Sequence, residues 1–227
     1  MGHEGVYDVE YHEGRRTNRA LKYRLERRTK EVQQAICLYG RQDISRIIDI
    51  GTADGLMLKR LYSSYMSSRT RCVGLDLSMG LLLSGDRQFS HLVQATALEL
   101  PFADKTSDVV IATAVIEHVS EPVRMMSECY RVLCDGGICV LTTPDPFFDR
   151  IAAMIGHVGK EGHKQTFGLS ALKALLEKTG FSVLNAEKFM MSPVGFPFEQ
   201  SIEKLMKRVY LGFLLLNQIV VGRKASV

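Results

Sequence analysis

The sequence predicts an α/β protein with helices on both faces of a mostly parallel, seven-stranded sheet whose last strand is antiparallel. Short apolar runs alternate with amphipathic segments through much of the chain, which is typical of consecutive strand–helix crossings. Two of these runs carry an acid near their carboxyl end, Asp49 and Asp76. The first is followed by a loop of small residues and then a helical pattern, as at the first crossing of a parallel sheet.

The elements follow in order along the chain. Residues 18–39 are expected to be a helix that begins at Asn18 and stops at Gly40. Ser120 is the expected N-cap of a later helix, and Pro122 suits its first turn. The expected strands are 46–50, 71–76, 91–95, 108–113, 137–143, 181–188 and about 217–223, and the expected helices between them are 55–66, 79–86, 121–133 and 169–178.

The chain reads as an N-terminal arm and helix over 1–43, on the substrate side, and one main domain over 44–227. Within that domain, 145–168 is expected to be a loop or loose cap. Residues 191–215 separate the last two strands and are too many for a hairpin turn, so we expect an inserted helix there. A Gly136-Gly137 turn is expected to precede the fifth strand.

The loop after the first strand reads Asp49-Ile50-Gly51-Thr52-Ala53-Asp54-Gly55. Glycine permits positive φ and a close approach of backbone to ligand, and open α/β sheets bind ligands at the carboxyl ends of their strands. The spacing differs from the Gly-x-Gly-x-x-Gly of dinucleotide folds, which argues against a nicotinamide or flavin enzyme. Asp76 ends the second strand, where an acid can accept hydrogen bonds from ribose hydroxyls.

Together with Leu100-Pro101-Phe102 and the Gly136-Gly137 turn, these motifs make residues 44–188 resemble the class I S-adenosylmethionine-dependent methyltransferases. The similarity is greatest to the small-molecule group that includes quinone-biosynthesis enzymes. It implies a Rossmann-like fold, S-adenosylmethionine as cofactor, and methylation of a small-molecule or lipid-linked acceptor, with oxygen favoured. The chain departs from the family pattern at Ala53, where a glycine is usual, and at Thr96, where an acid is common.

The resemblance also implies which residues form the site. The cofactor-binding residues would be Asp49, Gly51, Thr52, Ala53, Gly55, Asp76, Leu77, Thr96, Ala97, Leu98, Thr113 and Ala114. His118 is the candidate general base, although the Glu117-His118 pair could equally close the pocket. Tyr11, His12 and His163 are candidate substrate contacts.

Composition restricts the location of the protein and the kinds of site that it can contain. The chain is 46% apolar and 24% charged, lacks a long uncharged apolar run, and shows no signal-peptide core, so we expect a cytoplasmic globular protein. Five cysteines without a Cys-x-x-Cys pair suggest reduced core residues. The six histidines show no metal-ligand spacing, and no metal is expected.

Eight basic residues and one acid lie between Arg15 and Lys30. Such a run is most often a solvated helix face, and the sharper alternative is a docking surface for an anionic acceptor or an anionic membrane. Sparse aromatic residues disfavour nucleic acid. Alternatives to the small-molecule enzyme are an RNA or protein methyltransferase and a non-catalytic cofactor-binding module of the same fold.

Overall fold

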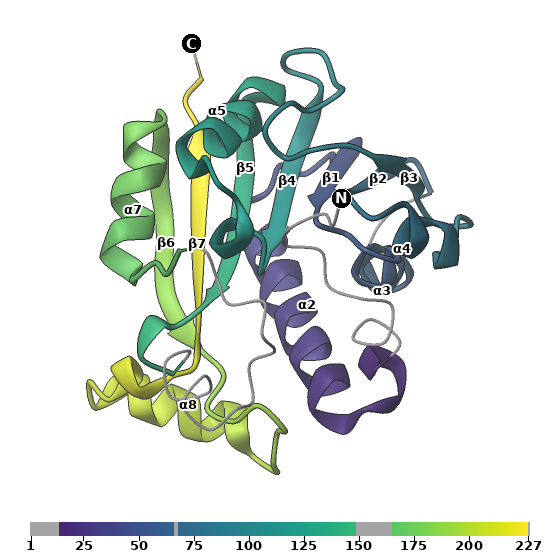
Figure 1. The fold of residues 1–227 in the computed structure, drawn as a ribbon. Coiled ribbons are helices and arrows are strands. Elements are labelled where there is room, and N and C mark those ends of the chain that lie inside the picture. The colour runs from purple at the N-terminus through teal and green to yellow at the C-terminus, as the bar shows by residue number, and fades with distance from the viewer. Residues whose placement is uncertain (1–13, 66–67, 149–164, 227) are drawn as a thin grey trace.

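The computed structural model describes residues 14–65, 68–148 and 165–226. Its centre is a seven-stranded sheet in the order β3-β2-β1-β4-β5-β7-β6 (Figure 1). The strands are β1 (Arg46–Ile50), β2 (Arg71–Asp76), β3 (His91–Gln94), β4 (Ser107–Thr113), β5 (Leu133–Pro144), β6 (Phe181–Phe189) and β7 (Asn217–Lys224). Strand β7 runs antiparallel between β5 and β6, and the other pairs are parallel, which confirms the predicted sheet.

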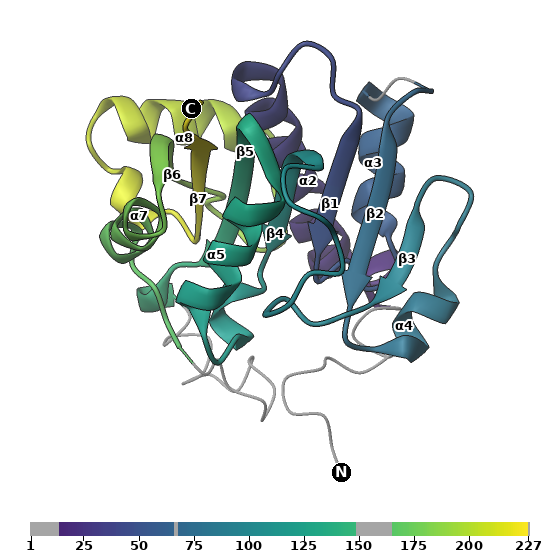
Figure 2. The same ribbon diagram turned by 90° about the horizontal axis from the view of Figure 1, so that it is seen from above.

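Helices cover both faces of the sheet, as Figure 2 shows for α5 and α7 on one side and α2 and α3 on the other. The helices are α2 (Arg19–Tyr39), α3 (Leu56–Tyr65), α4 (Met79–Ser84), α5 (Pro122–Val132), α7 (Leu169–Lys178) and α8 (Glu199–Arg208), with short 3-10 turns η1 (Ile116–His118) and η2 (Gly212–Leu214). Ile47 packs into the cluster under α2 and α3, while Ile48 packs into the cluster under α5 and α7. Successive strand residues point to opposite faces, so the continuous apolar runs fill two cores.

The ends of the long helix α2 are as predicted. The Asn18 side chain accepts hydrogen bonds from the amides of Ala20 and Leu21, and Gly40 forms the C-cap. The prediction for α5 was wrong by one residue. The N-cap position is occupied by Glu121, whose side chain makes no capping hydrogen bond. Pro122 favours the first helical position, so the helix starts one residue later than a cap at Ser120 would require.

The two glycines Gly136 and Gly137 lie inside β5, and the prediction of a turn before that strand was wrong. Strand β5 already pairs with β4 at Leu133, opposite Ser107, and the pairing resumes with Ile138 opposite Val109 after a register shift. At this irregularity Gly136 has a φ of +76°, a backbone conformation that residues other than glycine rarely adopt. The glycines therefore absorb extra residues within the strand.

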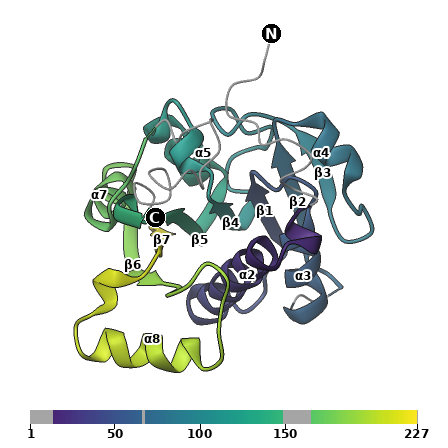
Figure 3. The same cartoon turned by 60° about the horizontal axis from the view of Figure 1, so that its bottom comes forward.

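The predicted insert between the last two strands contains helix α8. Phe189, the last residue of β6, pairs with Asn217, the first residue of β7, so the chain leaves and re-enters the sheet at neighbouring positions. In Figure 3, α8 lies outside the sheet, and its Glu203 forms an ion pair with Arg27 of the covering helix α2. The described helices include none with the length and apolar character needed to cross a membrane.

Candidate functional site

The carboxyl ends of four neighbouring strands carry the predicted cofactor residues. Ile50 of β1 lies opposite Leu75 of β2 and Ala112 of β4, and Asp76 of β2 lies opposite Gln94 of β3. The segments that follow these positions are therefore brought to one edge of the sheet. They contain the loop 51–55, Asp76 with Leu77, residues 96–98, and Thr113 with Ala114. This is the edge at which open α/β sheets bind their ligands.

The loop after β1 is built on left-handed backbone conformations. Gly51, Ala53 and Gly55 have φ values of +72°, +55° and +71°. A side chain at Gly51 would place its Cβ 2.3 Å from Cγ2 of Val115, so this position excludes any larger residue in the observed backbone. The amides of Gly51 and Thr52 both donate to the Leu75 carbonyl, at 2.8 and 2.9 Å. The loop is thus folded back over the end of β2.

Asp76 ties this loop to the next one. Its Oδ2 accepts the amide of Ala53 at 2.8 Å, and its Oδ1 accepts the amide of Ser78 at 2.9 Å. Ala53 is almost wholly buried and has a positive φ, a backbone conformation that is more strained for alanine than for glycine. The carboxylate therefore holds the loop closed.

Asp49 is a buried acid at the base of the same loop. Its side chain is 2% exposed, and its Oδ1 has no hydrogen-bond partner among the described residues. Burial raises the pKa of Asp49 to about 7; the Thr52 hydroxyl and the Arg15 charge act against this, and Asp76 adds to it. A buried acceptor left without a donor is costly unless a ligand supplies one.

The remaining predicted cofactor residues flank this centre. Oγ1 of Thr96 accepts the amide of Leu98 at 3.2 Å, and Ala97 packs on the core beneath. Leu77, beyond the end of β2, is half exposed. On the other side, the Thr113 hydroxyl faces Sδ of Met57 at 3.9 Å.

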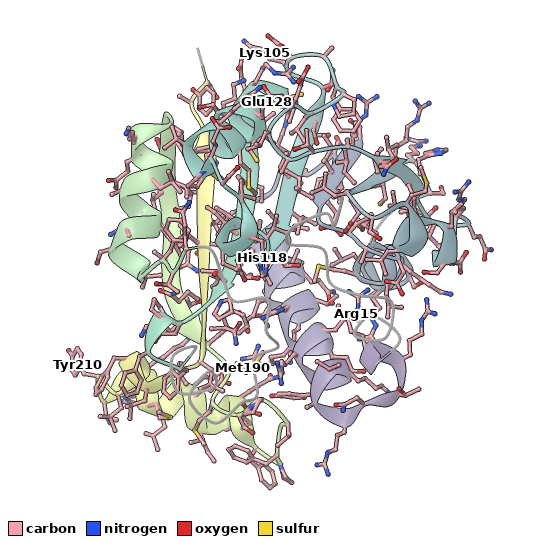
Figure 4. The ribbon with its side chains drawn as sticks, viewed as in Figure 1. Arg15, Lys105, His118, Glu128, Met190 and Tyr210 are labelled. Carbon is pink, nitrogen blue, oxygen red and sulfur yellow. The ribbon has the colours of Figure 1, made fainter. Side chains whose placement is uncertain are left out.

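Ala114 also has positive φ, and its amide donates to the Thr142 carbonyl at 2.8 Å, so β4 turns sharply into η1. His118 ends η1, is partly buried and lies near the centre of the view in Figure 4. Its neighbour Glu117 is 2% exposed and accepts the Thr143 hydroxyl at 3.1 Å. The three candidate substrate contacts, Tyr11, His12 and His163, lie outside the described residues.

Asp54 belongs to the site but was not among the predicted residues. It is buried, and its two carboxylate oxygens bind Nη2 of Arg15 at 2.5 Å and Nη2 of Arg16 at 2.8 Å. The available signal was an acid within the glycine loop together with an arginine pair in the arm. Nothing in the local pattern indicates that the two segments meet.

The basic run from 15 to 30 was expected to be a solvated helix face, but it is only partly so. Arg27 is 5% exposed and forms ion pairs with Glu31 and with Glu203 of α8. Arg28 donates to Asn217 at 3.1 Å. Several of these charges therefore hold parts of the fold together, and the run gives less support to an RNA-binding function than the sequence suggested.

Comparisons with known proteins agree with this geometry. Residues 48–141 match the family model described as a methyltransferase domain. The chain is 37% identical over 117 residues to a probable S-adenosylmethionine-dependent methyltransferase of Mycolicibacterium smegmatis, covering 50% of this chain and 44% of that protein. It is 32% identical over 102 residues to a malonyl-[acyl-carrier protein] O-methyltransferase of Marinomonas sp., covering 43% and 37%. The chain thus spans less than half the length of either relative.

The fold is shared with solved structures. The crystal structure of an S-adenosylmethionine-dependent methyltransferase from Archaeoglobus fulgidus superposes with a TM-score of 0.66 at 20% identity, covering 96% of this chain and all of that one. At this identity the likeness shows the fold alone. The matched segment, the sheet order and the glycine loop agree: residues 48–141 form a methyltransferase domain, and the fold is that of the class I S-adenosylmethionine-dependent methyltransferases.

Proposed function

We propose that this protein transfers a methyl group from S-adenosylmethionine to a small-molecule or lipid-linked acceptor, with oxygen as the favoured acceptor atom. The observation that carries the proposal is the convergence of Asp49, the loop 51–55 and Asp76 at one sheet edge. The name of the malonyl-[acyl-carrier protein] O-methyltransferase relative supports an oxygen acceptor on a carrier-linked substrate.

The residues at this edge fit the cofactor. The buried Asp49 carboxyl, with one oxygen lacking a partner among the described residues, suits the cationic amine of the methionine part. Gly51 and Gly55 have positive φ, which lets the loop turn tightly beside this carboxyl. We assign Asp76 to the ribose hydroxyls, Thr96 to Leu98 with Leu77 to the adenine, and Thr113 with Ala114 to the methionine part.

When bound, S-adenosylmethionine supplies an electrophilic methyl group that leaves a neutral thioether after transfer. The protein has to place the acceptor in line and exclude water, which together can supply most of the rate. A hydroxyl acceptor must also lose its proton, and we propose His118 as the base that takes it. An acceptor that is already ionised needs no such base.

Calorimetry with S-adenosylhomocysteine tests the proposed site without knowledge of the acceptor. We expect saturable binding and a raised melting temperature, with no effect from NAD. Asp76→Asn should weaken binding by about 10- to 100-fold, since a charged hydrogen bond contributes roughly 1.5–3 kcal/mol. Asp43→Asn, at an exposed position outside the site, is the matched control. Equal binding by Asp76→Asn and Asp43→Asn would refute the ribose assignment.

Turnover is tested by release of S-adenosylhomocysteine in the presence of phenolic and carboxylic acceptors, both soluble and lipid-linked. On a phenolic acceptor, His118→Asn should lower kcat by about 100-fold or more while the binding of S-adenosylhomocysteine is kept. Unchanged kcat in this variant would assign His118 to closure of the pocket.

A further inference from the structure

Helix α8 has the reverse of the usual orientation for a surface helix. Its two acids, Glu199 and Glu203, are 4% and 3% exposed and face the protein. Its apolar residues point outward instead. A surface helix of a globular protein normally buries its apolar stripe and exposes its charges.

The buried acids have specific partners, so the orientation is built into the fold. Oε1 of Glu199 accepts the amides of Met191 and Ser192, both at 2.8 Å, and the Tyr23 hydroxyl donates to Oε2. Glu203 forms an ion pair with the buried Arg27. Turning the apolar face inward would leave these charges unsatisfied or expose the arginine.

The outward side chains form a continuous surface that we call the apolar ridge. On α8 they recur every three or four residues and so share one face of the helix. The following turn extends the ridge, and Figure 4 shows Tyr210 at its outer end. The ridge consists of Phe198, Ile202, Leu205, Val209, Tyr210, Leu211, Phe213 and Leu214. Phe198 and Tyr210 are the most exposed, at 82% and 91%.

The exposed charges of the insert itself are all positive, and the partly exposed acid that reaches it, Glu187 of β6, is paired with Lys207. Glu199 and Glu203 are the only acids between residues 191 and 224, and both face inward. Lys204 and Arg208 are exposed on the same helix. Nearby, a cleft of about 530 Å³ is bounded by Val194 and Phe196 of the insert and by basic residues of the arm and of α2. Those basic residues are Arg16, Arg19 and Lys22, with Glu26 as the one acid.

We propose that the apolar ridge docks on the surface of a lipid bilayer that contains anionic lipids. Amphipathic helices lie in the interface plane with their apolar face among the acyl chains, and basic side chains beside them bind anionic head groups. The cleft next to the insert provides further positive charge for a head group. This inference concerns where the protein works, and it does not depend on methyl transfer.

A lipid surface fits this face better than a second copy of the chain. A two-fold dimer would bring the ridge onto itself, and with it the basic residues Lys204 and Arg208 against the equally basic surface of the second copy. Like charges facing each other oppose such an interface, whereas an anionic bilayer attracts all of them.

The full chain should be sedimented with vesicles of phosphatidylcholine alone and of phosphatidylcholine mixed with phosphatidylglycerol, at low and moderate salt. We expect binding to the mixed vesicles that weakens with salt. Leu205→Gln with Val209→Gln should reduce binding at least about tenfold, because two inserted apolar groups are lost. Lys204→Glu with Arg208→Glu should reduce it at least about tenfold as well, because each lost basic residue weakens binding by about fivefold.

Matched controls separate the ridge from general effects. Leu38→Gln with Val123→Gln removes an exposed leucine and valine elsewhere, and Lys173→Glu with Arg87→Glu makes the same change in net charge elsewhere. Melting curves confirm that each variant is folded. The proposal is overturned if no vesicles bind, if binding is independent of lipid charge, or if the controls lose as much as the ridge variants. A dimer that Leu205→Gln with Val209→Gln dissolves, without vesicle binding, would also overturn it.

Discussion

Arg15 and Asp54 form an ion pair of 2.5 Å that joins the chain before α2 to the glycine loop after β1. Arg16 binds the second oxygen of the same carboxylate, so two successive arginines form ion pairs with one buried acid. Asp54 also accepts the amide of Leu56 at 3.3 Å, at the start of α3. The position of the arm and the shape of the glycine loop are therefore linked through a single side chain.

Asp54→Asn should lower the free energy of unfolding by about 3 kcal/mol, because it leaves Arg15 mostly buried beside a neutral partner. Chemical denaturation measures this. The control is Asp86→Asn, which breaks the solvent-exposed pair with Lys59 and should cost far less stability, because water screens exposed ion pairs. Equal losses in the two variants would mean that the Arg15–Asp54 pair is no more than a surface contact.

Gly51→Ala should destabilise the protein by at least about 2 kcal/mol, since the residue has positive φ and its Cβ would collide with Val115. Gly168→Ala is the control, because among the described residues none except its chain neighbours has an atom within 4 Å of the added Cβ. Adding Val115→Ala separates the two causes. If the collision matters, the loss of stability in the double variant is smaller than the sum of the losses in the two single variants. If the two losses simply add, backbone strain is the only cause.

The buried carboxyl of Asp49 should make stability depend on pH. Its pKa is raised to about 7, so the folded state keeps a proton that the unfolded chain loses near pH 4. The stability that this bound proton contributes to the folded state is fully present below about pH 4 and is lost as the pH rises through about 7. At about 1.4 kcal/mol per pKa unit, the loss is about 4 kcal/mol at most.

Asp49→Asn removes this ionisation. Relative to the parent, its melting temperature should therefore be higher at pH 8 than at pH 5, and Asp43→Asn controls for loss of an exposed carboxyl. The same difference from the parent at both pH values would show that Asp49 does not stay protonated in the fold.

The Arg27–Glu203 pair should behave as one unit. Burial alone would lower the pKa of Arg27, but Glu31 and Glu203 raise it, so the guanidinium stays charged. Arg27→Met or Glu203→Met alone should cost about 3–5 kcal/mol because each leaves a buried charge. The double variant should cost clearly less than the sum, as measured by a denaturation cycle. Strict additivity would indicate that the two residues act separately.

Local signals were sufficient for the strands, the Asn18 cap and the positions of Asp49 and Asp76, because each depends on residues that are close in sequence. The bulge at Gly136 was missed because paired glycines look the same in a turn and within a strand. The orientation of α8 was missed for a different reason. Its pattern does not say which face is buried, since that depends on Arg27 and Tyr23, which lie more than 170 residues away.

The pairing of Phe189 with Asn217 has a consequence for how this chain could diversify. Since β6 ends where β7 begins, and the Leu216 amide bonds to the Met190 carbonyl at 2.8 Å, a short turn could replace everything between them without moving either strand. The segment that contains α8 joins the sheet at two adjacent points, and it is also anchored by the contacts of Glu199 and Glu203 with Tyr23 and Arg27 of α2. Related chains could exchange, lengthen or discard it, and so acquire new surroundings or acceptors, while the sheet that would hold the cofactor stays the same.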